Sequence, residues 1–246
     1  MIPPRSFAGS SIGRKAVMAL SGVVLFGFVV GHMLGNLQVY LGPSALNGYG
    51  ENLRRLPALL WAARLGLLAA TALHVWAAWS LTRSNRRARP VGYRERRNRE
   101  SSYASRTMRW SGVLVLVFVV YHLMHFTFGT PWVHPRFVPG DVYHNFVTGL
   151  RSAPVATFYL AATVGLGLHM YHGVWSMLHT LGLSHPRFDD LRYRVAAGIT
   201  AVVVIGNLSF PIAVLTGVLR ERPAAVAAGG PGAGSGPPEA PGAGAR

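Results

Sequence analysis

The chain has 246 residues, of which half are hydrophobic and only 13% are charged, and its formal net charge is +16. Soluble domains contain about 25% charged residues, so this composition favours a membrane protein. Because the chain has no cysteine, it can form no disulfide, hold no iron–sulfur cluster on thiolates and attach no haem covalently.

Five segments are long and apolar enough to span a membrane, which takes about 20 mostly apolar residues. The predicted spans are residues 15–38, 57–82, 110–130, 154–181 and 195–219. They predict an all-α fold, an integral membrane bundle of five transmembrane helices, with no internal repeat of fixed period. Residues 1–14 form a predicted N-terminal arm, 15–220 the membrane domain, and 221–246, rich in Ala, Gly and Pro, a predicted disordered tail.

The positive charges are distributed unequally between the connecting segments. Sixteen of the 24 lysines and arginines lie in the N-terminal arm, between the second and third spans, or between the fourth and fifth spans. Since positively charged segments stay in the cytoplasm, the N-terminus is predicted to be cytoplasmic and the C-terminus outside. Basic residues beside apolar helices indicate contact with membrane lipid, and no nucleic acid partner is expected.

Histidines inside the predicted spans are the strongest functional signal. Ionisable residues are costly in a membrane, and imidazole is a standard axial ligand of haem iron. At a rise of about 1.5 Å per residue, His32 and His122 fall in the outer half of the bilayer, and His74 and His169 fall in the cytoplasmic half. The sequence therefore predicts two haems, an outer and an inner one, each held by two histidines from different helices.

Further polar residues are candidates for roles beside these haems. His125 and His172 each lie one turn beyond a candidate ligand and are candidates for contact with a propionate or a quinone, or for simple packing. Arg64 is a candidate partner of the outer haem propionates, unless it extends to the interface. Glu51 is either a group that exchanges quinone protons or a solvated charge. The remaining histidines are predicted to be interfacial or loop residues: His134, His144, His179 and His185.

Four strings around these histidines resemble the dihaem cytochrome b anchors of succinate dehydrogenases and fumarate reductases, in their single-subunit, five-helix form. The strings are GHMLGN, ALHVWAAWS, VVYHLM and LHMYHGVWSM, and the resemblance covers residues 10–220. It implies two non-covalent b haems, a cytoplasmic flavoprotein with FAD that oxidises succinate, and an iron–sulfur subunit. It also implies a membrane quinone, typically menaquinone, and a non-catalytic electron-transfer role in the bacterial cytoplasmic membrane.

One position departs from the pattern of the family. Some anchors of fumarate reductases carry a glutamate two residues before the fourth ligand, where this chain has Gly167, so that proton route is not expected here. Two other functions remain open from the sequence. One is a dihaem cytochrome b subunit of a hydrogenase or formate dehydrogenase, and the other is a haem-free membrane transporter whose histidines bind substrate or protons.

Overall fold

The computed structural model describes residues 10–88, 103–182 and 185–221, and these residues form helices and no strand. Five of the helices are long and apolar enough to cross a membrane, so the predicted five-helix membrane bundle is confirmed. The spanning helices are α1 (Ser11–Asn36), α3 (Pro57–Arg87), α4 (Tyr103–His122), α6 (Ala153–Thr180) and α7 (Asp189–Leu215). The shorter elements are η2 (Leu37–Leu41), α2 (Pro43–Arg54), η3 (Leu123–Thr127), α5 (Val142–Leu150) and η4 (Pro186–Phe188).

Most spanning helices extend beyond the apolar runs that predicted them, because a helix continues into its polar ends. α1 begins early because Ser10 caps it, with its hydroxyl accepting a hydrogen bond from the Gly13 amide at 2.9 Å. α7 begins at two aspartates, Asp189 and Asp190, whose charge suits the positive end of the helix dipole. α3 begins at its predicted proline, Pro57.

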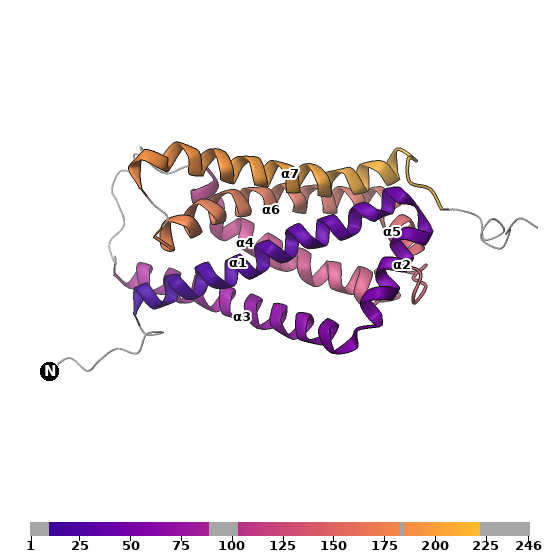
Figure 1. Cartoon of the computed structure of the whole chain (residues 1–246), viewed down its shortest axis with the longest axis horizontal. Helices are drawn as coiled ribbons and strands as arrows, with labels where there is room; N and C mark the ends of the chain where they lie inside the picture. The colour runs from indigo at the N-terminus through magenta and orange to yellow at the C-terminus, as the bar shows by residue number, and fades with distance from the viewer. Residues whose placement is uncertain (1–9, 89–102, 183–184, 222–246) are drawn as a thin grey trace, which may run out of the picture.

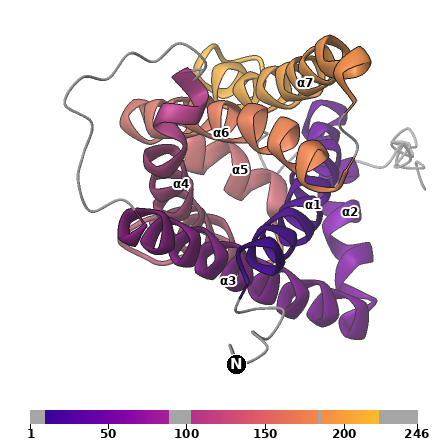
Figure 2. The same cartoon turned by 90° about the vertical axis from the view of Figure 1, so that its left-hand side faces the viewer.

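The helices run along one common axis and alternate in direction (Figure 1). α1 packs along α3, α4 packs along α6, and α7 packs against α6 and part of α1. Seen from the end at which α1 begins, α1, α3, α4 and α6 surround a common centre and α7 lies outside this ring (Figure 2). Side chains that point to the centre of the ring are therefore shielded by four helices.

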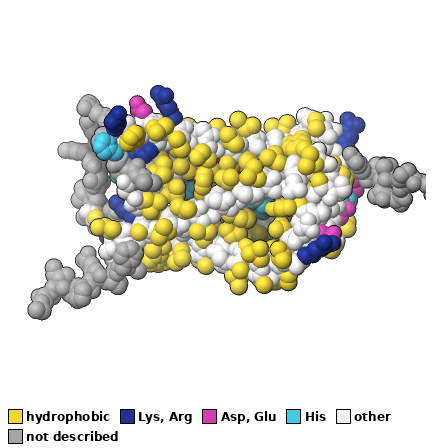
Figure 3. Space-filling view, viewed as in Figure 1, with side chains coloured by type: hydrophobic (Ala, Val, Ile, Leu, Met, Phe, Trp, Pro, Cys, Tyr) yellow, Lys and Arg dark blue, Asp and Glu magenta, His cyan; other side chains and the backbone are white. Residues whose placement is uncertain are grey.

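The two ends of the bundle differ in character. The basic end, where α1, α4 and α7 begin, carries most of the described cations, and an apolar band separates it from the far end (Figure 3). Large apolar side chains on this band are exposed, such as Leu68, Val202 and Ile205 at 62%, 63% and 68%. A continuous exposed apolar surface of this kind is the lipid-facing side of a spanning bundle.

The capped end, opposite the basic end, is covered by η2, α2, η3, α5 and the loop 128–141, and its short helices α2 and α5 were not predicted. α2 has Pro43 in its first turn, and α5 begins after Asp141, whose carboxylate accepts a hydrogen bond from the His144 amide at 3.0 Å. Leu46 from α2 and Leu150 from α5 are almost fully buried in the same apolar core. Both helices are amphipathic and short, so a search for long apolar runs passes over them.

Candidate functional site

The structure brings the four predicted ligand histidines together in two pairs inside the ring of helices. His32 of α1 and His122 of α4 have ring centroids 5.7 Å apart, and His74 of α3 and His169 of α6 have ring centroids 6.3 Å apart. We call the first couple the outer pair and the second the inner pair. Along α1, Ser21 stands beside the inner pair and His32 belongs to the outer pair, which separates the two levels by about 16 Å.

The spacing within each pair fits two axial ligands of one metal ion. Two imidazoles that bind one ion from opposite sides, each through a bond of about 2 Å, have ring centroids roughly 6 Å apart. In the part of the chain that the structure describes, no group of three or more His, Cys, Asp or Glu side chains could hold an ion. The pairs therefore fit a haem, whose macrocycle supplies the other four ligands, better than a bare metal ion.

A backbone carbonyl and two serine hydroxyls fix the hydrogen positions of the inner pair. The Nδ1 atom of His74 lies 3.2 Å from both the Ser21 hydroxyl and the Met18 carbonyl, and a carbonyl can only accept. His74 therefore carries its hydrogen on Nδ1 and keeps the lone pair of Nε2 free for a metal. The Ser111 hydroxyl lies 3.3 Å from Nδ1 of His169 and donates its own hydrogen to the Met108 carbonyl. It can therefore only accept from His169, which carries its hydrogen on Nδ1 as His74 does.

Glycines make room beside the inner pair. A Cβ atom at Gly22 would lie 3.4 Å from Cε1 of His74, and one at Gly112 would lie 3.3 Å from Cε1 of His169. Each glycine follows the serine that bonds the same histidine. Small side chains at these positions let the imidazoles lie close to the neighbouring helix, which leaves the centre of the ring for a flat macrocycle.

The serine, glycine and histidine positions expose an internal repeat that the sequence analysis missed. The segment SGVVLFGFVVGH starting at Ser21 matches SGVLVLVFVVYH starting at Ser111, and each is followed by the helix that carries an inner histidine. The helix pairs α1–α3 and α4–α6 therefore carry a serine, an outer histidine and an inner histidine in the same order, and we call them two copies of one pattern. A search at fixed period does not detect the repeat, because the two copies have connecting segments of different length.

The outer pair lies in an aromatic environment. The ring of His32 stacks on Phe28 with centroids 5.2 Å apart, and no hydrogen bond to His32 occurs among the described residues. Nδ1 of His122 lies 3.3 Å from the Tyr159 hydroxyl, and that hydroxyl lies 2.9 Å from Nδ1 of His125. Tyr159 was not predicted from the sequence, because a tyrosine within an apolar span carries no distinguishing signal.

The helix that carries His122 changes its winding directly after this residue. Residues Leu123–Thr127 form a π-helical turn, η3, which occurs often at functional sites. This turn places His125 in the interior, where its side chain is 1% exposed. His122, at the end of α4, and His125, within η3, both contact the hydroxyl of Tyr159.

His134 lies in a loop, as predicted, and the side chain of His134 is buried, at 3% exposed. Its Nδ1 bonds the His125 carbonyl at 3.1 Å and its Nε2 bonds the Thr148 hydroxyl at 3.1 Å. Burial lowers the pKa of His134 below its ordinary value of 6.5, His144 and Arg136 lower it further, and the bond to the carbonyl opposes them. The loop folds inward because these two bonds satisfy both ring nitrogens.

The remaining candidates lie away from the paired rings. Glu51 is exposed on α2 and forms an ion pair of 2.7 Å with Arg55, and Arg64 is exposed on α3 with its guanidinium 5.0 Å from the centroid of the Trp61 ring. Neither makes a hydrogen bond or ion pair with the four histidines in the described segments. His172 is half-buried on α6, with its ring 5.9 Å from that of Trp175.

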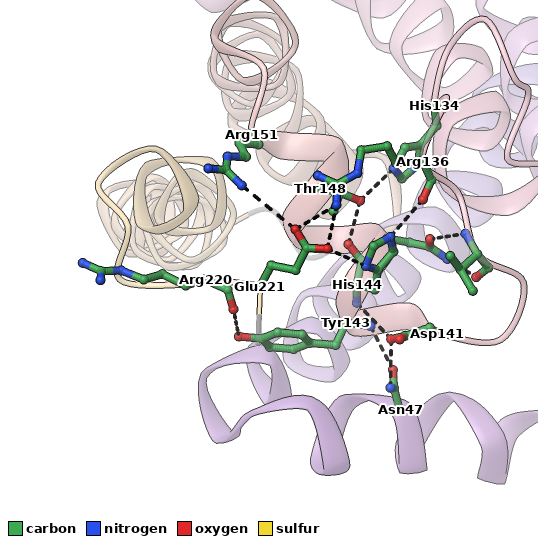
Figure 4. Close-up of polar contacts among 12 residues, drawn as sticks. Asn47, His134, Arg136, Asp141, Tyr143, His144, Thr148, Arg151, Arg220 and Glu221 are labelled. Atoms are coloured by element: carbon green, nitrogen blue, oxygen red, sulfur yellow. Dashed lines mark hydrogen bonds and ion pairs between the residues drawn. The ribbon is translucent and has the colours of Figure 1, made fainter. Parts of the chain in front are cut away.

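A cluster of ion pairs closes the capped end (Figure 4). Glu221, the first residue of the predicted tail, accepts from Arg136 at 2.7 Å and lies 3.2 Å from His144 and 4.0 Å from Arg151. The rest of the predicted tail, 222–246, lies outside the described residues. Glu221 thus ties the end of α7 to α5 and to the loop that contains His134.

Comparison with known proteins identifies one family. No curated protein and no solved structure matches the chain significantly. One family model matches residues 83–207, about half of the chain, and its description is succinate dehydrogenase/fumarate reductase transmembrane subunit. The matched region contains α4, α6 and most of α7, and therefore one histidine of each pair. With its five spanning helices, the chain belongs to the family of succinate dehydrogenase/fumarate reductase transmembrane subunits.

Proposed function

We propose that this chain is the membrane anchor of a succinate:quinone oxidoreductase and carries electrons through two b-type haems. The observation that carries the proposal is the presence of two histidine pairs, each drawn from two helices, at two levels of one membrane bundle. Membership of the family supplies the complex in which such an anchor works. The chain itself transforms no succinate, and its role is to hold redox groups and conduct electrons.

In this proposal His74 and His169 hold the inner haem through Nε2, and His32 and His122 hold the outer haem in the same way. When bound, the haems supply two one-electron carriers at different depths of the membrane. The serine and tyrosine hydroxyls beside the rings orient three of the four imidazoles and keep hydrogen on Nδ1. The apolar and aromatic side chains of the bundle exclude water from both levels.

The proposed electron acceptor is a membrane quinone of the menaquinone type. Glu51 is the proposed group for proton exchange with quinone, and Arg64 the proposed partner of the outer propionates, since both lie in the half of the bundle that contains the outer pair. His125 and His172 are proposed contacts of a propionate or quinone. The exposure of Glu51 and Arg64 leaves both side chains free to reorient toward such a ligand.

The proposed partners are a flavoprotein with FAD and an iron–sulfur protein, both at the basic end. The positive-inside rule places this end in the cytoplasm of a bacterium, with the chain in the cytoplasmic membrane. Its cations suit the anionic lipid of the inner leaflet and an acidic docking surface on the iron–sulfur subunit. The inner pair is the nearer of the two to this end, so it is the proposed entry point for electrons.

The proposal is tested on protein purified with its partners in a mild detergent. The measurements are a reduced-minus-oxidised absorption spectrum and a quantification of haem. We expect two haems per chain, and we expect His169→Ala to retain one, because the inner pair then lacks a ligand while the outer pair is intact. His179→Ala, on an exposed position of the same helix, is the matched control and should retain both haems.

Three results would contradict the proposal. Purified protein without haem would favour a membrane transporter, and two haems in the His169→Ala variant would refute the ligand assignment. Co-purification of a nickel or molybdenum subunit, in place of a flavoprotein with succinate activity, would assign the chain to a hydrogenase or formate dehydrogenase.

A further inference from the structure

The proposed haem ligands differ in what their Nδ1 atoms meet. In the inner pair, each Nδ1 faces a serine whose own hydrogen returns to the backbone of the serine's helix. His122 in the outer pair instead meets Tyr159, and the hydroxyl of Tyr159 continues to His125. Among the described residues, this is the one ligand whose hydrogen bond leads on to a second ionisable side chain.

The two hydrogen bonds that join His122, Tyr159 and His125 have a single consistent direction of donation. A His122 that binds metal through Nε2 carries its hydrogen on Nδ1 and donates it to the oxygen of Tyr159. The hydroxyl of Tyr159 then donates its own hydrogen to Nδ1 of His125, at 2.9 Å. His125 is therefore the terminal acceptor, with its hydrogen on Nε2, the atom that a Cβ at Gly149 would approach to 2.8 Å.

Tyr159 and His125, the two residues beyond His122 in this series of hydrogen bonds, are held rigidly. His125 is 1% exposed, its ring centroid is 4.8 Å from that of His134, and its carbonyl accepts from Nδ1 of His134. Tyr159 is 8% exposed and packs against Phe118 with ring centroids 5.0 Å apart. Neither side chain can turn away without breaking buried contacts, so the hydrogen bonds to His122 are preorganised.

We propose that Tyr159 and His125 are positioning residues that increase the electron donation of His122 and thereby lower the midpoint potential of the outer haem. This inference rests on the proposed function. A hydroxyl that donates to His125 is a stronger acceptor, since hydrogen bonds in series polarise one another. An acceptor on Nδ1 makes an imidazole more basic at Nε2, and a more basic ligand favours the ferric state over the ferrous state.

The experiment is a spectroscopic redox titration of the purified complex that resolves both haems. Tyr159→Phe removes the acceptor of His122, and we expect the preference of the outer haem for the ferric state to fall roughly tenfold, the order of the effect that such partners have on metal affinity. For a one-electron couple this raises the midpoint potential by about 59 mV. His125→Leu leaves the tyrosine but removes its acceptor, so it should shift the same potential upward by less.

Two controls separate this effect from a general disturbance. Tyr121→Phe deletes a hydroxyl from the same aromatic cluster, where Tyr121 packs on His125 with centroids 5.5 Å apart. No hydrogen bond to that hydroxyl occurs within the described segments, so both potentials should stay unchanged. Ser111→Ala, which removes the partner of His169, should shift the inner haem alone.

The outcomes distinguish the proposed role of Tyr159 and His125 from the function on which it rests. An upward shift of the outer potential in Tyr159→Phe and His125→Leu, with the inner potential constant, supports the proposal. An unchanged midpoint potential of the outer haem in either variant, with full haem content, overturns the proposal. If Tyr159→Phe loses the outer haem, the potential of the outer haem in His125→Leu decides. Absence of haem from the unmodified protein would instead refute the electron-transfer function itself.

Discussion

At the scale of single residues, the inner and outer histidines differ in the side chains that surround them. The inner histidines are held by a serine and bordered by a glycine, whereas the outer ones lie among aromatic rings. A buried imidazole with one engaged nitrogen keeps a defined tautomer. The groups that meet Nδ1 therefore determine which nitrogen three of the four proposed ligands, His74, His122 and His169, present to the centre of the bundle.

Gly149 is a position where one added methyl group should have a large effect. A Cβ there would lie 2.8 Å from Nε2 of His125 and 3.1 Å from Cε1 of His134, and both rings are buried. We expect Gly149→Ala to lower the free energy of unfolding by about 1–3 kcal/mol, because the rings must shift. Thermal unfolding in detergent, followed by circular dichroism, measures the change.

Gly48→Ala is the matched control for this substitution. Gly48 also lies in a short helix of the capped end, but a Cβ there would meet nothing within 4 Å. Alanine has the higher helix propensity, so this variant should be as stable as the original or more stable by up to about 1 kcal/mol. Equal losses of unfolding free energy in both variants would show that the stability of the capped end does not depend on the His125–His134 contact.

At the scale of elements, the short helices and the π-helical turn place the polar side chains of the capped end. η3 directs His125 inward, and α5 supplies Gly149 and Thr148 beside the buried histidines. The loop between η3 and α5 is held by hydrogen bonds, among them those of His134 and those between Val138 and Asn145, rather than by an apolar core of its own. This part of the molecule should therefore respond to pH more than the spanning helices do.

The capped end should lose stability as the pH falls through about 6.5. Folding lowers the pKa of His134 from 6.5, so below this pH the unfolded loop binds a proton that the folded loop does not, and protonation favours opening. Above pH 6.5 both states are neutral and the full stability is present. Hydrogen exchange of the α5 amides at pH 7.5 and 5.5, corrected for intrinsic rates, measures the effect.

His134→Gln should weaken this pH dependence, since an amide does not titrate in this range. His179→Gln, at an exposed position near the basic end, should leave it as it was. Protection of α5 that is independent of pH in the original protein would contradict the assignment of His134 as the responding group.

At the scale of the whole molecule, two copies of one helix-pair pattern face one another across a common centre. Each copy contributes one histidine to the inner pair and one to the outer pair, so neither copy holds a complete ligand pair alone. α7 is outside this duplication and packs on α6 and α1. The distribution of cations then orients the duplicated unit in the membrane.

This orientation can be tested with single cysteines, because the chain has none of its own. Ser44 is exposed at the capped end and Asn85 at the basic end. In intact spheroplasts, a membrane-impermeant maleimide should label Ser44→Cys at once and Asn85→Cys only after lysis. The reverse labelling pattern would place the basic end outside and contradict the cytoplasmic docking of partners.

The sequence by itself determined the number of spans, their order and the depth of each histidine. These quantities depend on distance along one helix, since apolar length and a rise of about 1.5 Å per residue convert position into depth. The resemblance around the histidines, likewise local in the chain, led to the family that the comparison with known proteins shows.

Only the tertiary structure decided which hydroxyl meets which ring and which loop folds inward. The contacts of Ser21 with His74 and of Tyr159 with His122 join different helices, and the burial of His134 depends on α5. Such contacts depend on how helices rotate and cross when they pack, and hydropathy along one segment contains no information about its neighbour. The proton assignments of the proposed ligands therefore follow from packing, whereas the choice of ligands follows from the sequence.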